Sequence, residues 1–225
     1  MRWNALVEMA CVLSHACFRR LERKSDSMLK IATSNAHATA VPSEMSTRES
    51  VPTIRNATSD DVEAITSIYN HYVCESVATL QESESRASDI KRKLDSIRSK
   101  GMPYVVAEDT TGTVCGYAYA DDWNDRTGYK FTVEGSIYLH PDHRGRGIGK
   151  SLLPTVLDQL RGCGKEQVVA KISILPGQVA RDVPSCRLHM AYGFEPVGRL
   201  LKVGFKRDQW IDVIFLQLAL NGVSK

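Results

Sequence analysis

Long hydrophobic runs, paired cysteines and an excess of either charge are all missing from this 225-residue sequence. The longest uncharged apolar stretches, such as Val213 to Leu220, fall far short of the roughly 20 residues that span a bilayer, so we expect no membrane segment. The 29 basic and 26 acidic residues leave a net charge of +3, and this small imbalance does not indicate a nucleic-acid partner.

The six cysteines are scattered along the chain and form no C-x-x-C pair. This spacing favours neither a zinc site nor a disulfide scaffold, and it is typical of reduced thiols in a cytosolic or organellar protein. We therefore expect no metal. What the sequence does contain, 43% hydrophobic and 24% charged residues, is the balance of a globular chain.

The first fifty residues differ in composition from the rest of the chain. The stretch from Ala32 to Ser50 is rich in small and polar residues and has too few apolar side chains to offset the entropy of ordering. A short apolar patch near Ala10 precedes its basic residues, the reverse of a secretory signal, and Glu8 and Glu22 argue against a mitochondrial presequence. We expect residues 1–50 to be a poorly ordered extension or an over-long gene start of a cytoplasmic protein, with a mitochondrial targeting peptide as the alternative.

Residues 51–225 have the pattern of a single α/β domain. Apolar residues at helical spacing alternate with short β-prone runs, and glycine, proline and helix-capping residues separate them. The expected helices begin near Thr58, Ser88, Ile148 and Ser185, and the expected strands are 52–57, 104–108, 114–120, 131–139, 167–174, 197–205 and 210–218. The order β-α-α-β-β-β-α-β-α-β-β predicts one domain.

One segment carries specific chemistry, a glycine-rich turn between the strand that ends at Leu139 and the following helix. Its residues include Arg144, Gly145, Arg146, Gly147 and Gly149. Glycines leave the backbone N–H groups unobstructed, and the dipole of a helix N-terminus favours negative charge. The turn therefore suits a pyrophosphate.

Spacing excludes two common phosphate-binding loops. A Walker loop needs a glycine five residues before Gly149, where this chain has Arg144. A dinucleotide fingerprint needs G-x-G-x-x-G, whereas Gly145, Gly147 and Gly149 are spaced evenly by two. A surface turn rich in arginine and glycine that binds nothing stays as the alternative.

Residues Arg144 to Gly149 fit R/Q-x-x-G-x-G/A, the signature with which the GNAT superfamily of N-acetyltransferases holds the pyrophosphate of acetyl-CoA. From about Ile54 to Leu218 the chain also resembles the phosphinothricin and methionine sulfoximine acetyltransferase family. The matching segments are Asn70-His71-Tyr72, Trp123 with Arg126 and Tyr129, Thr132-Val133-Glu134, Ile137-Tyr138, Leu188-His189, Gly193-Phe194, Gly204-Phe205-Lys206 and Trp210-Ile211-Asp212-Val213. The resemblance implies a mixed, mostly antiparallel sheet of about seven strands flanked by four helices. It also implies acetyl-CoA-dependent N-acetylation of a small amino-acid-like amine.

Acetyl transfer needs a neutral amine, so a base must remove a proton from the ammonium. The resemblance assigns this role to Glu134, on the strand before the turn. A proton for the thiolate commonly comes from a tyrosine on the short helix before a Gly-Phe pair, and His189 stands at that position here, with Tyr192 expected to pack. An exposed strand glutamate and a structural histidine are the ordinary alternatives.

The resemblance also implies a set of coenzyme contacts. They are expected from the strand end, the turn and the start of two helices: Ile137, Tyr138, Leu139, Arg144, Gly145, Arg146, Gly147, Ile148, Gly149, Lys150, Asp182 and Ser185. The family usually has an asparagine where this chain has Asp182, after an apparent insertion at 177–180. Pro154 is a second departure, because a proline inside the expected helix removes the hydrogen bond to the Lys150 carbonyl and favours a kink.

The expected acceptor contacts are His71, Tyr72, Arg126 and Tyr129. An arginine fork and a phenol hydroxyl suit the carboxylate of an amino acid. A protein or polyamine acetyltransferase is the alternative enzyme, which an acidic groove around 121–125 would favour, and a non-catalytic acyl-CoA sensor is the alternative of another class. The resemblance further implies a homodimer, in which the apolar segment 204–213 is the expected contact.

Overall fold

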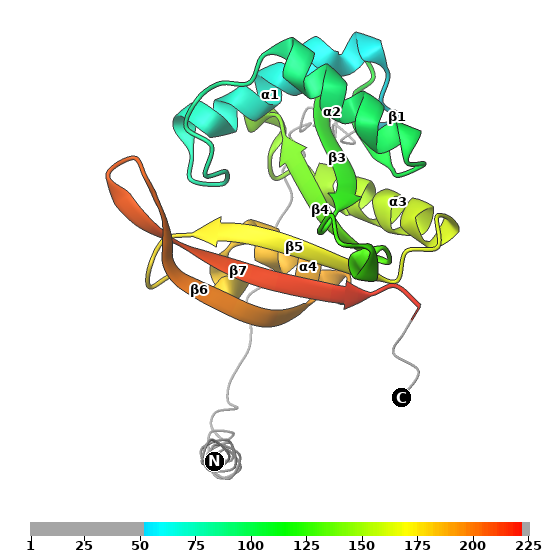
Figure 1. Cartoon of the computed structure of the whole chain (residues 1–225). Coiled ribbons are helices and arrows are strands. Elements are labelled where there is room, and N and C mark those ends of the chain that lie inside the picture. The colour runs from blue at the N-terminus through cyan, green and yellow to red at the C-terminus, as the bar shows by residue number, and fades with distance from the viewer. Residues whose placement is uncertain (1–51, 222–225) are drawn as a thin grey trace, which may run out of the picture. The chain divides into compact units, whose positions relative to one another are not determined.

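The computed structural model describes residues 52–221, which form one sheet with helices on both faces (Figure 1). Seven strands follow the order β1-β2-β3-β4-β5-β7-β6 across the sheet. Only β4 and β5 run parallel, and every other neighbouring pair is antiparallel. The strands are β1 (Thr53–Asn56), β2 (Tyr104–Glu108), β3 (Val114–Asp122), β4 (Thr132–Leu139), β5 (Gln167–Ile174), β6 (Glu195–Lys206) and β7 (Gln209–Ala219). The extension predicted for residues 1–50 lies outside the described residues.

The α-helices are α1 (Val62–Glu75), α2 (Ala87–Ser99), α3 (Ile148–Gly162) and α4 (Pro184–Ala191). This order of strands and helices confirms the predicted one, and the mixed, mostly antiparallel sheet with four helices confirms the predicted fold class. The boundaries differ from the predicted ranges by only a few residues. Within residues 52–221, none of the helices has the length and apolar character needed to cross a membrane.

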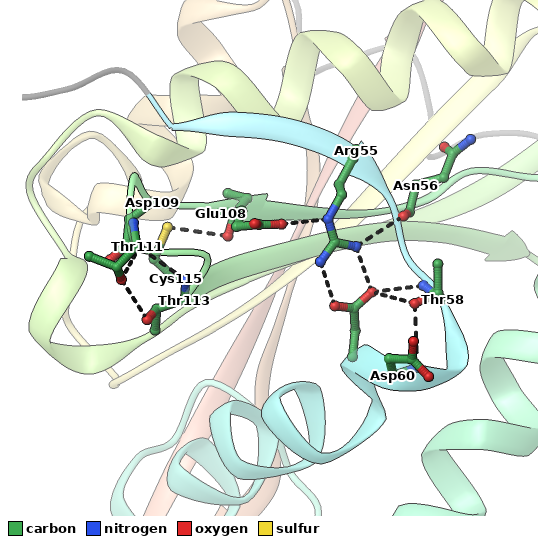
Figure 2. A network of polar contacts seen from close by, with 11 residues as sticks. Arg55, Asn56, Thr58, Asp60, Glu108, Asp109, Thr111, Thr113 and Cys115 are labelled. Carbon is green, nitrogen blue, oxygen red and sulfur yellow. Dashed lines mark hydrogen bonds and ion pairs between the residues drawn. The ribbon is translucent and has the colours of Figure 1, made fainter.

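The start of α1 is fixed by the capping residues that the sequence predicts. The Thr58 side chain and the Asp61 carboxylate form a capping box around the short 3-10 turn Ser59–Asp61, which leads directly into α1. Arg55 of β1 donates to both oxygens of Asp61, at 2.8 Å each, and to Glu108 at the end of β2 (Figure 2). Burial alone would raise the pKa of Asp61, but the hydrogen bonds from Arg55 and Thr58 outweigh it and hold that pKa below its ordinary value.

Tyrosine side chains cover the sheet face that lies under α1 and α2. Tyr117 of β3 stacks on Tyr138 of β4 with the ring centroids 5.3 Å apart, and Tyr69 of α1 meets Tyr138 edge-on at 5.4 Å. Lys93 of α2 donates to the Tyr119 hydroxyl at 2.7 Å. Aromatic stacking and this hydrogen bond attach both helices to the same face.

The opposite face packs against α3 and α4. A Cβ on Gly116 of β3 would lie 2.8 Å from the Leu139 side chain and 3.4 Å from Leu152 of α3, so this packing requires glycine. Helix α4 lies against the first turn of α3, where a Cβ on Gly149 would meet Leu188 at 2.8 Å. Each helix pair thus covers one face, and residues that alternate along a strand point to different pairs.

The one parallel pair of strands opens into a fork. Strands β4 and β5 are paired only over Thr132 to Glu134 and Gln167 to Val169. Both strands continue beyond this segment, β4 to Leu139 and β5 to Ile174, and Figure 1 shows them diverging. On the side that faces β5, the backbone of residues 135–139 therefore has no strand partner among residues 52–221, which leaves hydrogen-bond donors and acceptors for an extended ligand.

Candidate active site

Glu134 lies at the vertex of the fork, as the last residue of β4 that is paired with β5. Its carboxylate forms an ion pair with Lys171 of β5, with 2.6 Å between Oε2 and Nζ. Glu134 is opposite Val169 in the register, so Lys171, two residues later, points to the same face. The two side chains are 29% and 41% exposed, so a ligand can reach both of them.

Two aromatic rings, Trp123 and Phe215, lie beside this ion pair. The Lys171 ammonium lies 5.4 Å from the centroid of the Trp123 ring, within the range of a cation–π contact. The Trp123 ring meets Phe215 of β7 edge-on at 6.2 Å, and Phe215 is directly opposite Lys171 in the register. The vertex of the fork therefore combines an anion, a cation and an apolar surface.

The glycine-rich turn lies after the end of β4 and leads into α3. Gly145 and Gly147 both have φ of 79°, a conformation that other residues adopt only with strain. Arg144, Arg146 and Lys150 are exposed on the turn, whereas Ile148 is buried under it. Because the first N–H groups of a helix have no partner inside the helix, this exposed turn offers backbone donors and positive charge together.

His71 and Tyr72, which the sequence predicts as acceptor contacts, lie against the predicted coenzyme residues. Arg144 donates to Nε2 of His71 at 2.9 Å, and the Tyr72 hydroxyl donates to the Leu139 carbonyl at 2.7 Å. The Arg144 guanidinium also stacks 5.3 Å from the centroid of the Tyr72 ring. Helix α1 thus holds the end of β4 and the arginine of the turn in place.

His189 is 4% exposed and lies on α4, on the face opposite to Glu134. Its Nδ1 is 2.8 Å from the Ser185 carbonyl, so Nδ1 carries the proton and donates it, and the ring meets Phe194 edge-on. Burial lowers the pKa of His189 from its ordinary value of 6.5, and the hydrogen bond to Ser185 opposes this only in part. A neutral ring with its proton on Nδ1 has an acceptor, not a donor, at Nε2.

The predicted coenzyme contacts Asp182 and Ser185 flank the start of α4, and both are exposed. The carbonyl of Asp182 accepts from Arg187, while its carboxylate has no hydrogen bond with another described residue. Arg199 of β6 donates to the Gln178 carbonyl, which attaches the predicted insertion at 177–180 to β6. This segment lies between the end of β5 and the start of α4.

Arg126 and Tyr129 lie on the loop between β3 and β4. The backbone N–H of Arg126 donates to the Asn124 side chain, and Tyr129 is 43% exposed. Among residues 52–221, neither side chain contacts Glu134, Lys171 or the turn through a hydrogen bond or ion pair. The structure thus pairs Glu134 with Lys171 at the fork, and it shows no such contact for Arg126 or Tyr129 among the described residues.

Sequence reasoning missed Lys171. The available signal was a single lysine in the otherwise apolar and β-branched run from Gln167 to Ile174, since a charge in such a strand calls for a partner. The partner itself depends on the pairing of β4 with β5. Over the described part of the chain, no cluster of three or more histidine, cysteine, aspartate or glutamate side chains is arranged to hold a metal ion.

The sequence is similar to known acetyltransferases. The model of the acetyltransferase (GNAT) family matches residues 65–194. L-methionine sulfoximine/L-methionine sulfone acetyltransferase of Salmonella typhimurium is 38% identical over 172 residues, which cover 75% of this chain and 95% of that protein. Phosphinothricin N-acetyltransferase of Alcaligenes faecalis is 36% identical over 75% of this chain and 83% of that protein.

Solved structures give the same result. A GNAT superfamily phosphinothricin acetyltransferase from Sinorhizobium meliloti, crystallised in complex with acetyl-CoA, superposes with a TM-score of 0.72 at 38% identity. The match covers 78% of this chain and 92% of that one. The similarity therefore includes the sheet, the fork and the turn.

Proposed function

The chain belongs to the acetyltransferase (GNAT) family, and on that premise we propose that it acetylates the primary amine of a small amino-acid-like substrate, of the phosphinothricin or methionine sulfoximine type. It is an N-acetyltransferase, and acetyl-CoA is its co-substrate. The observation that carries the proposal is the position of Glu134, a reachable carboxylate at the vertex of a fork, on the strand that leads to the glycine-rich turn.

The residues present fit the coenzyme. The unpaired edge of β4 from Ile137 to Leu139 offers backbone groups to an amide-containing arm, and the turn from Arg144 to Lys150 offers N–H groups and cations to a pyrophosphate. Asp182 and Ser185 are exposed at the start of α4, which packs on the first turn of α3 through Leu188. When bound, acetyl-CoA supplies an acetyl group activated as a thioester.

We assign Glu134 the role of general base. The ammonium of the acceptor loses one proton to a carboxylate oxygen of Glu134, directly or through a water, and becomes a nucleophilic amine. The exposed edge of Glu134 makes this transfer possible, since the side chain is 29% exposed. The contacts of His71 with Arg144 and of Tyr72 with Leu139 favour a role for these two residues on the coenzyme side of the site.

The sequence predicts that His189 donates a proton to the thiolate. Its contacts restrict how it could do so. Only Nε2 is available, because Nδ1 donates to Ser185, and burial opposes the charged ring that Nε2 would need. A packing role at the junction of α4 and Phe194 accounts for the same contacts. We propose proton donation by His189, and the His189→Asn variant tests it.

The charges near the site argue against a protein or polyamine acceptor. An acidic groove would favour such substrates, but Lys100 pairs with both Asp121 and Asp122, at 3.0 Å, and Lys165 lies 3.5 Å from Asp122. With Asp121 and Asp122 paired, Asp125 is the one acidic residue of segment 121–125 without an ion pair among the described residues, which weakens the attraction for a polycation. Arg126 and Tyr129 fit anionic groups of an amino-acid-like acceptor instead.

We also propose that the enzyme is a cytoplasmic homodimer and that residues 51–225 are its catalytic domain, with 1–50 as an extension. Strand β6 is an edge strand, and its apolar side chains are largely exposed, such as Leu201 at 72% and Phe205 at 53%. Exposed apolar groups on a sheet edge favour pairing with a second copy.

Thiol release tests the proposed function. The full chain is incubated with acetyl-CoA and separately with L-methionine sulfone, phosphinothricin, spermidine and a lysine-containing peptide. We expect thiol release with the first two acceptors and little with the others. If the protein binds acetyl-CoA but releases no coenzyme A thiol with any of these amines, the result would support the sensor alternative and reject the enzyme.

A further inference from the structure

We propose that Lys171 binds the α-carboxylate of the acceptor and thereby releases Glu134 to act as the base. The proposal rests on the proposed function and adds a residue that determines substrate choice. It starts from one observation: the carboxylate in position to take a proton is held by a lysine ammonium 2.6 Å away.

The ion pair occupies the place where the acceptor must arrive. Glu134 is the last paired residue of β4, and Lys171 is on the part of β5 that has already diverged, so their contact bridges the vertex of the fork. Among the described residues, Glu134 is the one carboxylate within ion-pair distance of Lys171. Asp121, which is opposite Glu134 on β3, is paired with Lys100 instead. An incoming ligand can therefore exchange partners with this one pair.

A free α-amino acid has the complementary charges. Its ammonium and carboxylate are separated by a single carbon, so they can meet adjacent charges of opposite sign on the protein, the ammonium at Glu134 and the carboxylate at Lys171. Charge-assisted hydrogen bonds then form on both sides. The Trp123 and Phe215 rings, which flank Lys171, offer an apolar surface to the rest of the acceptor.

The exchange also explains how a paired carboxylate becomes a base. While Lys171 is bound to Glu134, a proton on Glu134 would cost the attraction between them. Once the acceptor carboxylate takes the lysine ammonium, Glu134 accepts one proton from the acceptor ammonium, and the result is a neutral acid, a neutral amine and a lysine–carboxylate pair. An amine without an α-carboxylate leaves Lys171 on Glu134 and adds a second positive charge.

The test compares two acceptors of similar size, L-methionine sulfone and its α-carboxamide, in which an uncharged amide replaces the carboxylate beside the amine. With the full chain and acetyl-CoA, we expect kcat/KM for the acid to exceed that for the amide at least tenfold. Lys171→Gln should reduce this ratio to about threefold or less, because it lowers the value for the acid and, by freeing Glu134, raises the value for the amide. Lys171→Arg, which keeps a cation at this position, should restore most of the ratio.

Two further variants make the result specific. Lys91→Gln removes an exposed lysine on α2 that pairs with Asp95, and it should leave the ratio unchanged. A wild-type ratio in Lys171→Gln would overturn the proposal, and loss of the ratio in Arg126→Gln instead would assign the carboxylate to Arg126. If the wild-type chain releases no thiol with any amine, the proposed function itself fails, which is a different outcome from an unchanged ratio.

Discussion

The hydroxyl of Tyr192 donates a hydrogen bond of 2.7 Å to the backbone carbonyl of Lys150. That carbonyl would normally accept from the N–H four residues later in α3, but the residue there is Pro154, which has no N–H. Helix α3 continues through Pro154 to Gly162, and a side chain at the end of α4 replaces the missing helical bond. Since Lys150 is part of the first turn of α3, the bond also braces the proposed coenzyme turn.

Tyr192→Phe should lower the free energy of unfolding by about 1 kcal/mol, the usual net contribution of one hydrogen bond. In a Pro154→Ala background the same change should cost much less, because an alanine at this position supplies the missing N–H. Chemical denaturation of the four proteins in this double-mutant cycle measures the coupling between residues 154 and 192. Equal losses in both backgrounds would contradict the replacement.

Tyr72→Phe is the matched control for this cycle. Its hydroxyl also donates to a backbone carbonyl at 2.7 Å, that of Leu139, but this carbonyl lies on β4 and does not depend on Pro154. We expect Tyr72→Phe to cost the same free energy with proline or alanine at position 154.

Gly147→Val should weaken coenzyme binding at least tenfold, which is about 1.4 kcal/mol. Gly147 has φ of 79°, so a β-branched residue either strains the turn or redirects its N–H groups. Calorimetry with coenzyme A measures the loss. Gly164→Val is the control, because Gly164 also has a positive φ, of 70°, but lies beyond the other end of α3. The coenzyme affinity of this variant should equal that of the wild type. Equal affinity of the Gly147 variant and the wild type would reject the assignment of the turn.

Glu134→Gln keeps the size of the side chain but removes its basicity, so turnover should fall by roughly a hundredfold or more while coenzyme affinity stays nearly constant. The defect should shrink as the pH rises, because a growing share of the acceptor then arrives as the neutral amine. Steady-state kinetics from about pH 6.5 to about pH 9.5 test both points. Glu166→Gln, at an exposed position before β5, serves as the control. A defect that is independent of pH would indicate a positioning role.

His189 should make stability depend on pH in a defined window. Burial lowers its pKa below 6.5 in the folded protein, so its contribution is complete above that pH and is lost as the pH falls below it. At about pH 5.5 the loss is at most about 1.4 kcal/mol. His189→Asn, which can still donate to Ser185, should remove this part of the pH dependence in denaturation curves between about pH 7.5 and about pH 5.5.

The carboxyls with lowered pKa values, such as Asp61 and Asp212, titrate below 3.8 and do not contribute in this window. An unchanged slope in His189→Asn would therefore show that His189 is not held neutral. The same variant tests the proton path, since turnover within about threefold of the wild type would remove His189 from it.

Leu201→Glu should convert the proposed dimer to a monomer, because it places a charge in the middle of the most exposed apolar side chains of β6. Sedimentation at micromolar concentration should give twice the 25.0 kDa mass for the wild type and the single mass for the variant. Phe131→Glu, at a residue that is 50% exposed just before β4, should leave the dimer intact. A wild type that sediments only as a single chain would reject the dimer.

Much of the fold follows from the sequence because its signals are local. The capping residues Thr58 and Asp61, the period of apolar residues along each helix and the β-prone runs all act between neighbours in the chain. The glycine-rich turn belongs to the same class, since Gly145 and Gly147 allow a positive φ without strain.

The sequence by itself thus determined the elements, the turn and the residue types available for chemistry. Only the tertiary structure decided which of them meet. Lys171 reaches Glu134 because β4 and β5 pair in one register and then diverge, and Tyr192 reaches Lys150 because α4 packs on the first turn of α3. Both contacts join segments distant in the chain, and such contacts depend on how whole elements pack, which no local pattern of residues encodes.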